Sequence, residues 1–352
     1  MTLLGSLGLL GASLATLGSN AGLYAVRTAG LPAHEIYGEE DFDAMLALPK
    51  RTVRTEDGVD LAVREVGSAL APLTIVFVHG YCLRMQSWHL QMRHLQERWG
   101  KDVRMVFYDQ RGHGESAVST SKSCTIAQLG RDLGTVIDTV VPTGPVVVVG
   151  HSMGGMTTIA LAAQRPELFD ERIVGVGLLA TTAAGLTKTG IGRNLENPVI
   201  DAFRHLARTA PGFVQYARGA AKAIIAPILR AASYGTVVSP KLVEFSDRML
   251  AETSVLTIVN FLRTLELHDE SAALPVLGQV PVLVLCGDAD MIIPFSGSEE
   301  LAAALPDVEL KRVRGAGHLV QLEFPEVVVG ALDRLIQRGF AHDAGRRRAA
   351  IG

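Results

Sequence analysis

The chain has 352 residues, of which 48% are hydrophobic and 20% are charged, and its formal net charge is −3. This composition is typical of a folded globular protein rather than a disordered one, and the slightly acidic charge gives no reason to expect a nucleic-acid partner. The three cysteines have no paired spacing, so the sequence predicts neither a disulfide framework nor a metal site. These cysteines are Cys82, Cys124 and Cys286.

The N-terminal stretch is apolar, and residues 2–26 carry no charged side chain. It is long enough to cross a bilayer as a helix. No Lys or Arg precedes it, which disfavours a secretory signal. The first basic residue, Arg27, would leave the body of the protein in the cytoplasm by the positive-inside tendency. We therefore expect residues 1–28 to form an apolar helix that associates with a membrane through residues 1–27.

Two other interpretations of this stretch stay open. The helix would dock on the protein's own surface, which would make the protein soluble and cytoplasmic, or it would be removed as a signal peptide. A polar linker over residues 29–49 follows in every case.

The body of the chain alternates between two kinds of pattern. Residues 51–66 alternate in hydrophobicity around Asp57-Gly58, which is typical of a β-hairpin. Apolar runs then predict strands, and amphipathic spacing predicts helices between them. The strands are 73–78, 103–108, 145–149, 173–179, 280–286 and 308–313, and the helices are 88–99, 126–140, 156–164 and 325–337. The alternation predicts an α/β fold with a mostly parallel central sheet flanked by helices.

The strand signal fades between residues 181 and 272, where prolines interrupt several predicted helices. These prolines are Pro198, Pro211, Pro227 and Pro240. The stretch predicts a helical cap, residues 181–272, inserted between two parts of one α/β core at residues 50–180 and 273–340. The last residues, 341–352, include three consecutive arginines and are expected to form a basic disordered tail.

A run of four valines, residues 146–149, leads into Gly150-x-Ser152-x-Gly154. Such a run is typical of a strand covered on both faces, and the glycine-flanked serine is the pattern of a nucleophile elbow, a sharp strand-to-helix turn. Glycines are needed because side chains at their positions would collide with neighbouring backbone. The turn would expose Ser152 Oγ at the carboxyl end of the sheet. It would also place the Met153 amide at a helix N-terminus, where partial positive charge can meet an oxyanion.

Further motifs follow the ends of the predicted strands. In chain order the motifs are His79-Gly80, Asp109-x-Arg111-Gly112-x-Gly114-x-Ser116, Gly150-His151-Ser152-Met153-Gly154, Gly287-x-x-Asp290 and Gly317-His318. With this order and the helical insertion, the chain resembles the α/β-hydrolase superfamily over residues 50–340. The resemblance is to serine esterases and lipases with a helical cap, including monoglyceride-lipase-like members. It implies the α/β-hydrolase fold and a hydrolytic activity.

The resemblance implies a triad in the order serine, acid, histidine, which falls on Ser152, Asp290 and His318. A serine hydroxyl is a poor nucleophile at neutral pH and needs a base within hydrogen-bond reach, a role for His318. A carboxylate on the other ring nitrogen would fix the tautomer and stabilise the imidazolium. Asp288 competes with Asp290 for that role, and the family's Gly-x-x-Asp spacing favours Asp290.

The resemblance also implies an oxyanion hole formed by the backbone amides of Tyr81 and Met153. Gly80 would let this loop approach the substrate closely, and His79 is expected to hold the loop rather than to act as a base. His151 is expected to point away from the serine. Because no metal cluster, phosphate loop or dinucleotide-binding pattern appears in the sequence, we expect no cofactor and no metal.

The sequence thus predicts a serine hydrolase that cleaves a carboxylic ester of a lipid-like or other apolar acyl substrate through an acyl-enzyme on Ser152. Serine at the elbow argues against epoxide hydrolases and haloalkane dehalogenases, which use aspartate there. Two alternatives stay open. One is another serine-dependent activity: a carbon–carbon bond hydrolase, a perhydrolase of the haloperoxidase type, an amidase or an acyltransferase. The other is a non-catalytic ligand-binding member.

Overall fold

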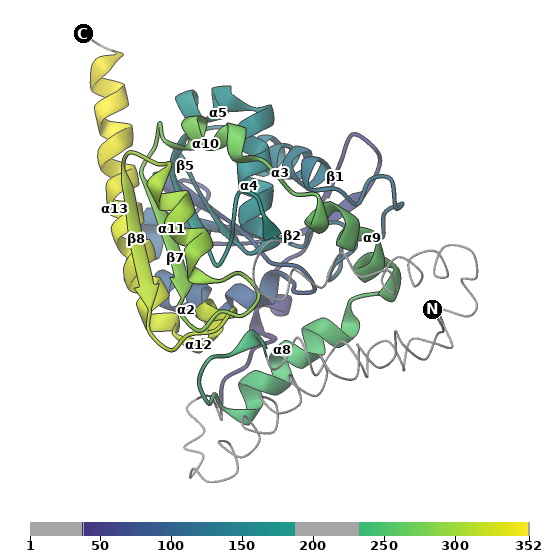
Figure 1. Ribbon diagram of the computed structural model, residues 1–352. Coiled ribbons are helices and arrows are strands. Elements are labelled where there is room, and N and C mark those ends of the chain that lie inside the picture. The colour runs from purple at the N-terminus through teal and green to yellow at the C-terminus, as the bar shows by residue number, and fades with distance from the viewer. Residues whose placement is uncertain (1–36, 38, 187–231, 351–352) are drawn as a thin grey trace, which may run out of the picture.

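The computed structural model describes residues 37, 39–186 and 232–350. Within them the chain forms an eight-stranded sheet in the order β1-β2-β4-β3-β5-β6-β7-β8. Figure 1 shows the edge strands β1 and β8 on opposite sides of the molecule. The strands are β1 (Arg51–Arg54), β2 (Asp60–Val66), β3 (Leu73–Val78), β4 (Val103–Tyr108), β5 (Val146–His151), β6 (Ile173–Leu179), β7 (Val282–Gly287) and β8 (Val308–Val313). Strand β2 is antiparallel to both neighbours, and the other pairs are parallel. The predicted, mostly parallel α/β sheet is confirmed.

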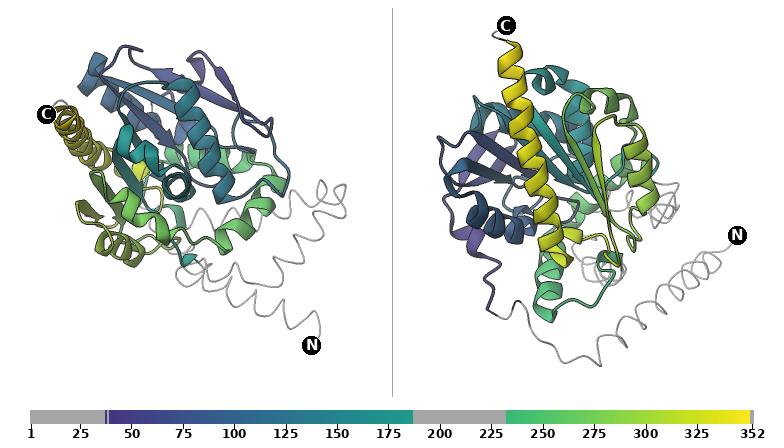
Figure 2. Two further views of the ribbon diagram at one scale, coloured as in Figure 1. Left: turned by 90° about the horizontal axis from the view of Figure 1, so that it is seen from above. Right: turned by 90° about the vertical axis from the view of Figure 1, so that its left-hand side faces the viewer.

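Helices cover both faces of the sheet. Helices α2 (His89–Trp99) and α13 (Pro325–Ala349) pack on one face, and α3 (Ile126–Val140), α4 (Met153–Gln164) and α10 (Leu274–Leu277) pack on the other. Figure 2 shows α13 running across its face, with its C-terminal end extending past the body. The shorter helices are α5 (Pro166–Glu171), α11 (Phe295–Ala303), α12 (Val320–Glu323), η1 (Ala44–Ala47), η2 (Met85–Trp88), η3 (Gly100–Asp102) and η6 (Ser271–Ala273).

Strands β3, β5, β6 and β7 are buried at every position because each face of the sheet has its own core. In β3, Ile75 and Phe77 belong to the core shared with α2 and α13, whereas Val76 and Val78 belong to the core shared with α3 and α4. All four side chains are at most 1% exposed. Successive side chains of a strand point to opposite faces, so the sequence of a strand between two helical layers is a nearly continuous apolar run.

The predicted elements agree closely with the structure inside this core. Strands β3, β4, β6 and β8 and helix α3 have the predicted bounds. Helix α4 begins at Met153 rather than at residue 156, because the turn at Ser152 passes directly into the helix. Strands β5 and β7 each extend beyond their predicted last residue and end next to the loops that carry the candidate site.

The predicted cap is described only in part, since residues 187–231, with Pro198, Pro211 and Pro227, lie outside the described residues. The described part contains α8 (Pro240–Glu252) and α9 (Val255–Glu266). Each begins at a serine whose Oγ accepts a hydrogen bond from the backbone of the first helical turn, Ser239 for α8 and Ser254 for α9. Pro240 occupies the first turn of α8, where proline suits a helix start. The predicted domain boundaries remain a prediction.

The C-terminal end corrects the sequence prediction. The sequence predicts a helix over residues 325–337 and a disordered tail over residues 341–352, but α13 continues to Ala349. Arginine and alanine are good helix formers, and a cation in the last turn favours the helix dipole. Arg347 also pairs with Asp343 one turn earlier at 2.8 Å, and Arg346 donates a hydrogen bond to the Phe169 carbonyl. The helix therefore has both local and tertiary support where the sequence indicated only charge.

Among the helices of residues 37–350 that the structure describes, none is both long enough and apolar enough to cross a membrane. The apolar segment at residues 1–28 lies outside the described residues. Its association with a membrane therefore remains a prediction.

A buried arginine ties the β1–β2 turn to α3. The fully buried guanidinium of Arg111 contacts both carboxylate oxygens of Asp132, at 2.6 Å each, and both oxygens of Asp57, at 2.7 and 2.9 Å. Asp132 is also fully buried, on α3, whereas Asp57 lies in the partly exposed hairpin turn. The guanidinium holds the pKa of Asp57 well below its usual range.

Replacing Arg111 should therefore be costly. In Arg111→Met, Asp132 would remain buried without its cation, and the free energy of unfolding should fall by about 3–5 kcal/mol. The double variant Arg111→Met/Asp132→Leu should recover much of this loss, because no unpaired buried charge remains. Urea denaturation of the wild type and both variants measures the difference. A double variant as unstable as the single one would show that the unpaired charge is not the cause.

Candidate active site

Ser152 lies in the sharp turn between β5 and α4, with φ at 53° and ψ at −119°. This conformation is strained for a residue with a side chain. A Cβ atom on Gly150 would lie 2.4 Å from the Gly154 carbonyl oxygen, and one on Gly154 would lie 2.1 Å from a β3 carbonyl oxygen. The Thr181 hydroxyl donates a hydrogen bond to the Ser152 carbonyl at 2.8 Å. The turn is thus closed by glycines on both sides and held by a buried threonine.

The candidate acid and base meet at the same end of the sheet. His318 follows β8, and its Nδ1 lies 2.8 Å from Oδ2 of Asp290, which follows β7. The other carboxylate oxygen of Asp290 accepts hydrogen bonds from the backbone N–H groups of Ile292 and Ile293, at 2.8 and 2.9 Å. The carboxylate is therefore held in one orientation. Because Nδ1 is bound to Asp290, Nε2 is the His318 nitrogen left for a reacting group.

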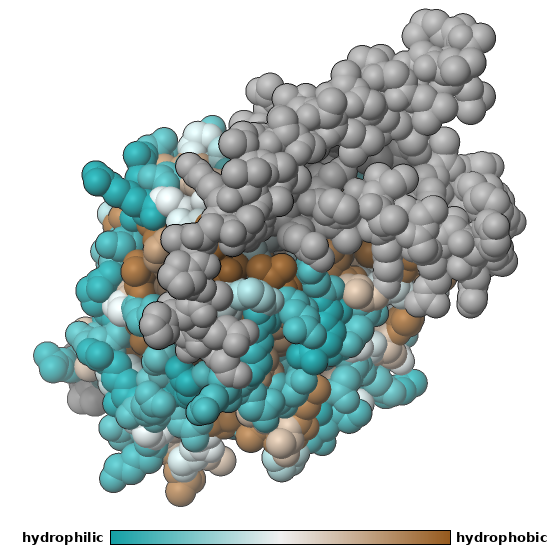
Figure 3. All heavy atoms as spheres, turned by 90° about the horizontal axis from the view of Figure 1, so that it is seen from below, coloured by the Kyte–Doolittle hydropathy of each residue, from teal (hydrophilic) through white to brown (hydrophobic). Residues whose placement is uncertain are grey.

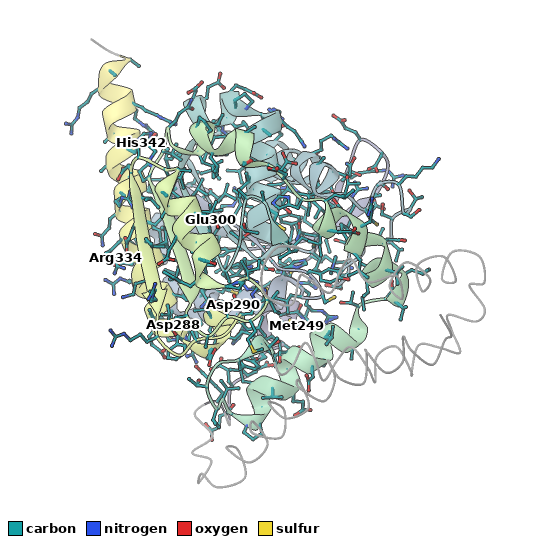
Figure 4. All side chains as sticks on the ribbon, viewed as in Figure 1. Met249, Asp288, Asp290, Glu300, Arg334 and His342 are labelled. Atoms are coloured by element: carbon teal, nitrogen blue, oxygen red, sulfur yellow. The ribbon has the colours of Figure 1, made fainter. Side chains whose placement is uncertain are left out.

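The competing acid, Asp288, has a different contact. Its Oδ1 accepts a hydrogen bond from the Gly315 N–H at 2.7 Å, so it holds the loop that leads to His318. Figure 4 shows Asp288 and Asp290 together at the lower end of β7. The geometry pairs Asp290, and not Asp288, with the histidine.

Ser152 and His318 line one pocket between the strand ends and the helices α8 and α9, and they are 8% and 6% exposed. The described part of its lining is mainly apolar. The apolar side chains are Leu83, Met156, Leu186, Leu250, Leu265, Ile292, Ile293 and Leu319, and the polar ones besides the serine and histidine include Ser233, Ser246 and Asp247. Seen from below, apolar side chains gather in the middle of a largely hydrophilic face (Figure 3).

The turn after β3 passes directly against the elbow. A Cβ atom on Gly80 would lie 3.2 Å from the Ser152 Cβ, so the backbone before Tyr81 runs beside the serine. Met153 is the first residue of α4, where backbone N–H groups have no acceptor within the helix. The Tyr81 hydroxyl, for which the sequence indicates no role, donates a hydrogen bond to the Ile258 carbonyl of α9 at 2.5 Å. This bond ties the candidate oxyanion turn to the described part of the cap.

His79 holds this turn. Its Nε2 accepts a hydrogen bond from the Gln110 N–H at 2.9 Å, and its Nδ1 lies 2.8 Å from the Gly80 carbonyl, which fixes the tautomer with the proton on Nδ1. Burial lowers the pKa of His79 well below its ordinary value, so the ring is neutral. Asp109 braces the same region by accepting hydrogen bonds from the N–H groups of Met85 and Glu115, at 2.7 and 2.8 Å.

His151 has a contact that sequence reasoning missed. Its Nε2 donates a hydrogen bond to the His318 carbonyl at 2.9 Å, and a Cβ atom on Gly80 would lie 2.7 Å from its Nδ1. The ring therefore lies between the candidate oxyanion turn and the histidine loop. Burial, and then the neighbouring His318, lower the pKa of His151 to about 3, so it stays neutral. Because the partners are 167 residues apart in sequence, no local pattern indicates this pairing.

A parallel sheet that carries a glycine-flanked serine turn, with a carboxylate–histidine pair at the same edge, defines the α/β class of hydrolases. The family model described as "Alpha/beta hydrolase family" matches residues 75–331. The chain therefore belongs to the alpha/beta hydrolase family, and the predicted superfamily membership is confirmed.

Several similar proteins carry lipase or esterase names. An sn-1-specific diacylglycerol lipase of Mus musculus is 25% identical over 76% of this chain and 81% of its own length. A monoacylglycerol lipase of Mycolicibacterium smegmatis is 26% identical over 70% of this chain and 81% of its own length. A thermophilic esterase from Thermogutta terrifontis superposes with a TM-score of 0.65 at 25% identity, covering 83% of this chain and 99% of that one. The chain is thus a hydrolase with esterase- and lipase-like relatives.

The buried imidazoles beside the site predict a pH-dependent stability. Burial lowers the pKa of His113 to about 4 from an ordinary 6.5, and its Nδ1 donates a hydrogen bond to the Arg111 carbonyl. Below pH 6.5 the unfolded chain binds a proton that the folded chain excludes, so folded stability falls as the pH falls. Relative to His113→Asn, which does not titrate, the wild type should lose about 3 kcal/mol between pH 7 and pH 4.

Urea denaturation of both proteins at several pH values measures this loss. The Asn side chain keeps a donor near the position of Nδ1, so the two proteins differ mainly in the titrating ring. A stability difference that stays constant between pH 7 and pH 4 would contradict the prediction.

Proposed function

We propose that this hydrolase cleaves a carboxylic ester with an apolar acyl group by a serine mechanism. The observation that carries the proposal is the shared pocket. Ser152 stands in a strained turn at its wall, and His318, whose Nδ1 is bound to Asp290 at 2.8 Å, lines the same space. In this arrangement the serine can act as the nucleophile, the imidazole as its general base, and the carboxylate as the group that orients the imidazole.

In the proposed acylation, Ser152 Oγ attacks the ester carbonyl carbon while His318 Nε2 takes the hydroxyl proton. Asp290 stabilises the imidazolium that forms. The amides of Tyr81 and Met153 donate hydrogen bonds to the oxyanion of the tetrahedral intermediate. His318 then gives the proton to the departing alcohol oxygen, which leaves an acyl-enzyme on Ser152. Water, deprotonated by the same imidazole, attacks this ester, and the imidazolium returns the proton to Ser152 Oγ as the acid is released.

The pocket lining supports an apolar acyl group. Met156, Leu265 and Ile293 belong to one buried apolar cluster at the wall that also carries Ser152. Burying each methylene group of an acyl chain there would stabilise the bound ester by about 0.8 kcal/mol. The relatives named diacylglycerol lipase and monoacylglycerol lipase favour the same class of substrate.

The acid assignment gives a matched pair of variants. Asp290→Asn keeps the shape of the side chain but cannot stabilise the imidazolium or enforce its tautomer, so kcat should fall on the order of 10³–10⁴-fold. Asp288→Asn should change kcat by less than about tenfold, because Asp288 only holds the loop through Gly315. Steady-state kinetics on a p-nitrophenyl ester measures both. A large loss in Asp288→Asn, with Asp290→Asn active, would reverse the assignment.

The reaction itself is tested by labelling and by substrate profiling. A fluorophosphonate probe should label the wild type and fail to label Ser152→Ala, because the adduct forms on Ser152 Oγ. With p-nitrophenyl esters, kcat/KM should rise from acetate to medium acyl chains by up to about fourfold for each added methylene that the pocket buries.

Two outcomes would contradict the proposal in different ways. A wild type that takes no label would favour a non-catalytic binding protein. A labelled enzyme that fails on every ester but cleaves a vinylogous diketone would favour a carbon–carbon bond hydrolase.

A further inference from the structure

A buried thiol lies against the candidate acid. Cys286, near the end of β7, is fully buried, and its Sγ lies 3.7 Å from Oδ2 of Asp290. The same oxygen lies 2.8 Å from Nδ1 of His318. No step of the proposed reaction uses this thiol.

The surroundings of the sulfur keep it protonated. Besides Asp290, its near neighbours include the carbonyl oxygens of Gly287 at 3.4 Å and Ile293 at 3.6 Å, which can only accept hydrogen bonds. Burial, and then the Asp290 charge, raise the pKa of the Cys286 thiol far above its ordinary value. Cys286 is therefore an S–H donor surrounded by oxygen acceptors, and among these three the carboxylate is the charged one and attracts the proton most strongly.

A second buried group adjoins the sulfur. Ser298, on α11, is fully buried and lies beside the Cys286 thiol. Its hydroxyl has no partner of full hydrogen-bond geometry among the described residues. Ser298 is therefore a polar neighbour of the sulfur without a formed hydrogen bond to it.

We propose that Cys286 is a positioning residue of this site: its thiol hydrogen bond to Asp290 Oδ2 draws negative charge away from the oxygen that binds His318, and so limits the basicity of His318. The inference rests on the proposed function, in which His318 is the base. A carboxylate without this donor would hold more charge on Oδ2 and would stabilise the imidazolium more strongly. Losing the thiol should therefore make the base active only at higher pH.

Two variants separate the hydrogen bond from packing. Cys286→Ala and Cys286→Val both remove the donor, but one side chain is smaller than cysteine and the other is larger. The matched control is Cys124→Ala, which removes another buried thiol, one that does not line the pocket. The readout is the rate of fluorophosphonate labelling of Ser152 against pH, which reports the base without requiring the natural substrate.

Other titratable groups near His318 are the same in all four proteins. His151 is neutral over this range, and Asp288 is bound to the Gly315 N–H. The Glu323 carboxylate of α12 accepts a hydrogen bond from the Gly317 N–H, and Asp247 of α8 lines the same pocket as His318. The effects of these groups on His318 are therefore the same in each protein and cancel when the midpoints of the labelling profiles are compared.

The labelling rate should fall as the pH is lowered, and the pH at which it is half-maximal is the midpoint of the profile. Both Cys286 variants should shift this midpoint to higher pH by about half a unit, the size expected for one weak S–H donor. Cys124→Ala should leave the midpoint unchanged. An unchanged midpoint in the Cys286 variants, or shifts of opposite sign for alanine and valine, would overturn the inference. If one variant does not fold, as judged by its thermal transition, the other still gives the sign of the shift.

Failure of the proposed function has a different signature. A wild type that takes no label at any pH would contradict the serine mechanism. The contact between the thiol and Asp290 would then be tested directly. The ¹⁵N shifts of the His318 ring, followed against pH in the wild type and in Cys286→Ala, then supply the test. A higher midpoint in the variant supports the inference, and equal midpoints overturn it.

Discussion

The close approach of backbone at the Ser152 turn is the constraint on which the rest of the site depends. The turn passes so near to β3 and to the start of α4 that a side chain on Gly150 or Gly154 would overlap backbone atoms. Such a turn persists only where the surrounding structure over-determines it. The two apolar cores on either side of the sheet supply that support, because they fix β3 and β5 side by side in one register.

Neutral imidazoles form a second layer around the turn. His79 and His151 are both fully buried, and each makes a hydrogen bond to a backbone carbonyl, at Gly80 and His318 respectively. A charged side chain in either place would carry a large desolvation cost, whereas a neutral imidazole can still donate one hydrogen bond. The loops that would carry the oxyanion amides and the base are thereby held without adding charge near the serine.

Much of this arrangement can be predicted from the sequence because it depends on local patterns. Apolar runs locate the strands, the flanking glycines locate the serine turn, and the Gly-x-x-Asp spacing selects Asp290 over Asp288. Contacts between residues distant in the sequence have no such pattern. The contact between the Cys286 thiol and Asp290 is also not predictable, although the two residues are only four apart, because it depends on how the loop after β7 folds back. The extended α13 was missed for a related reason, since Arg346 contacts Phe169 only after folding.

The hydrogen bond from the Tyr81 hydroxyl to the Ile258 carbonyl connects α9 directly to the turn after β3. Tyr81 links the two elements, because its hydroxyl reaches α9 while the backbone at Gly80 and Tyr81 runs beside Ser152. If α9 is displaced when a ligand enters the pocket, the displacement must either break the Tyr81–Ile258 hydrogen bond or move the turn after β3. As long as this bond holds, entry of a ligand past α9 and the position of the turn beside Ser152 are coupled.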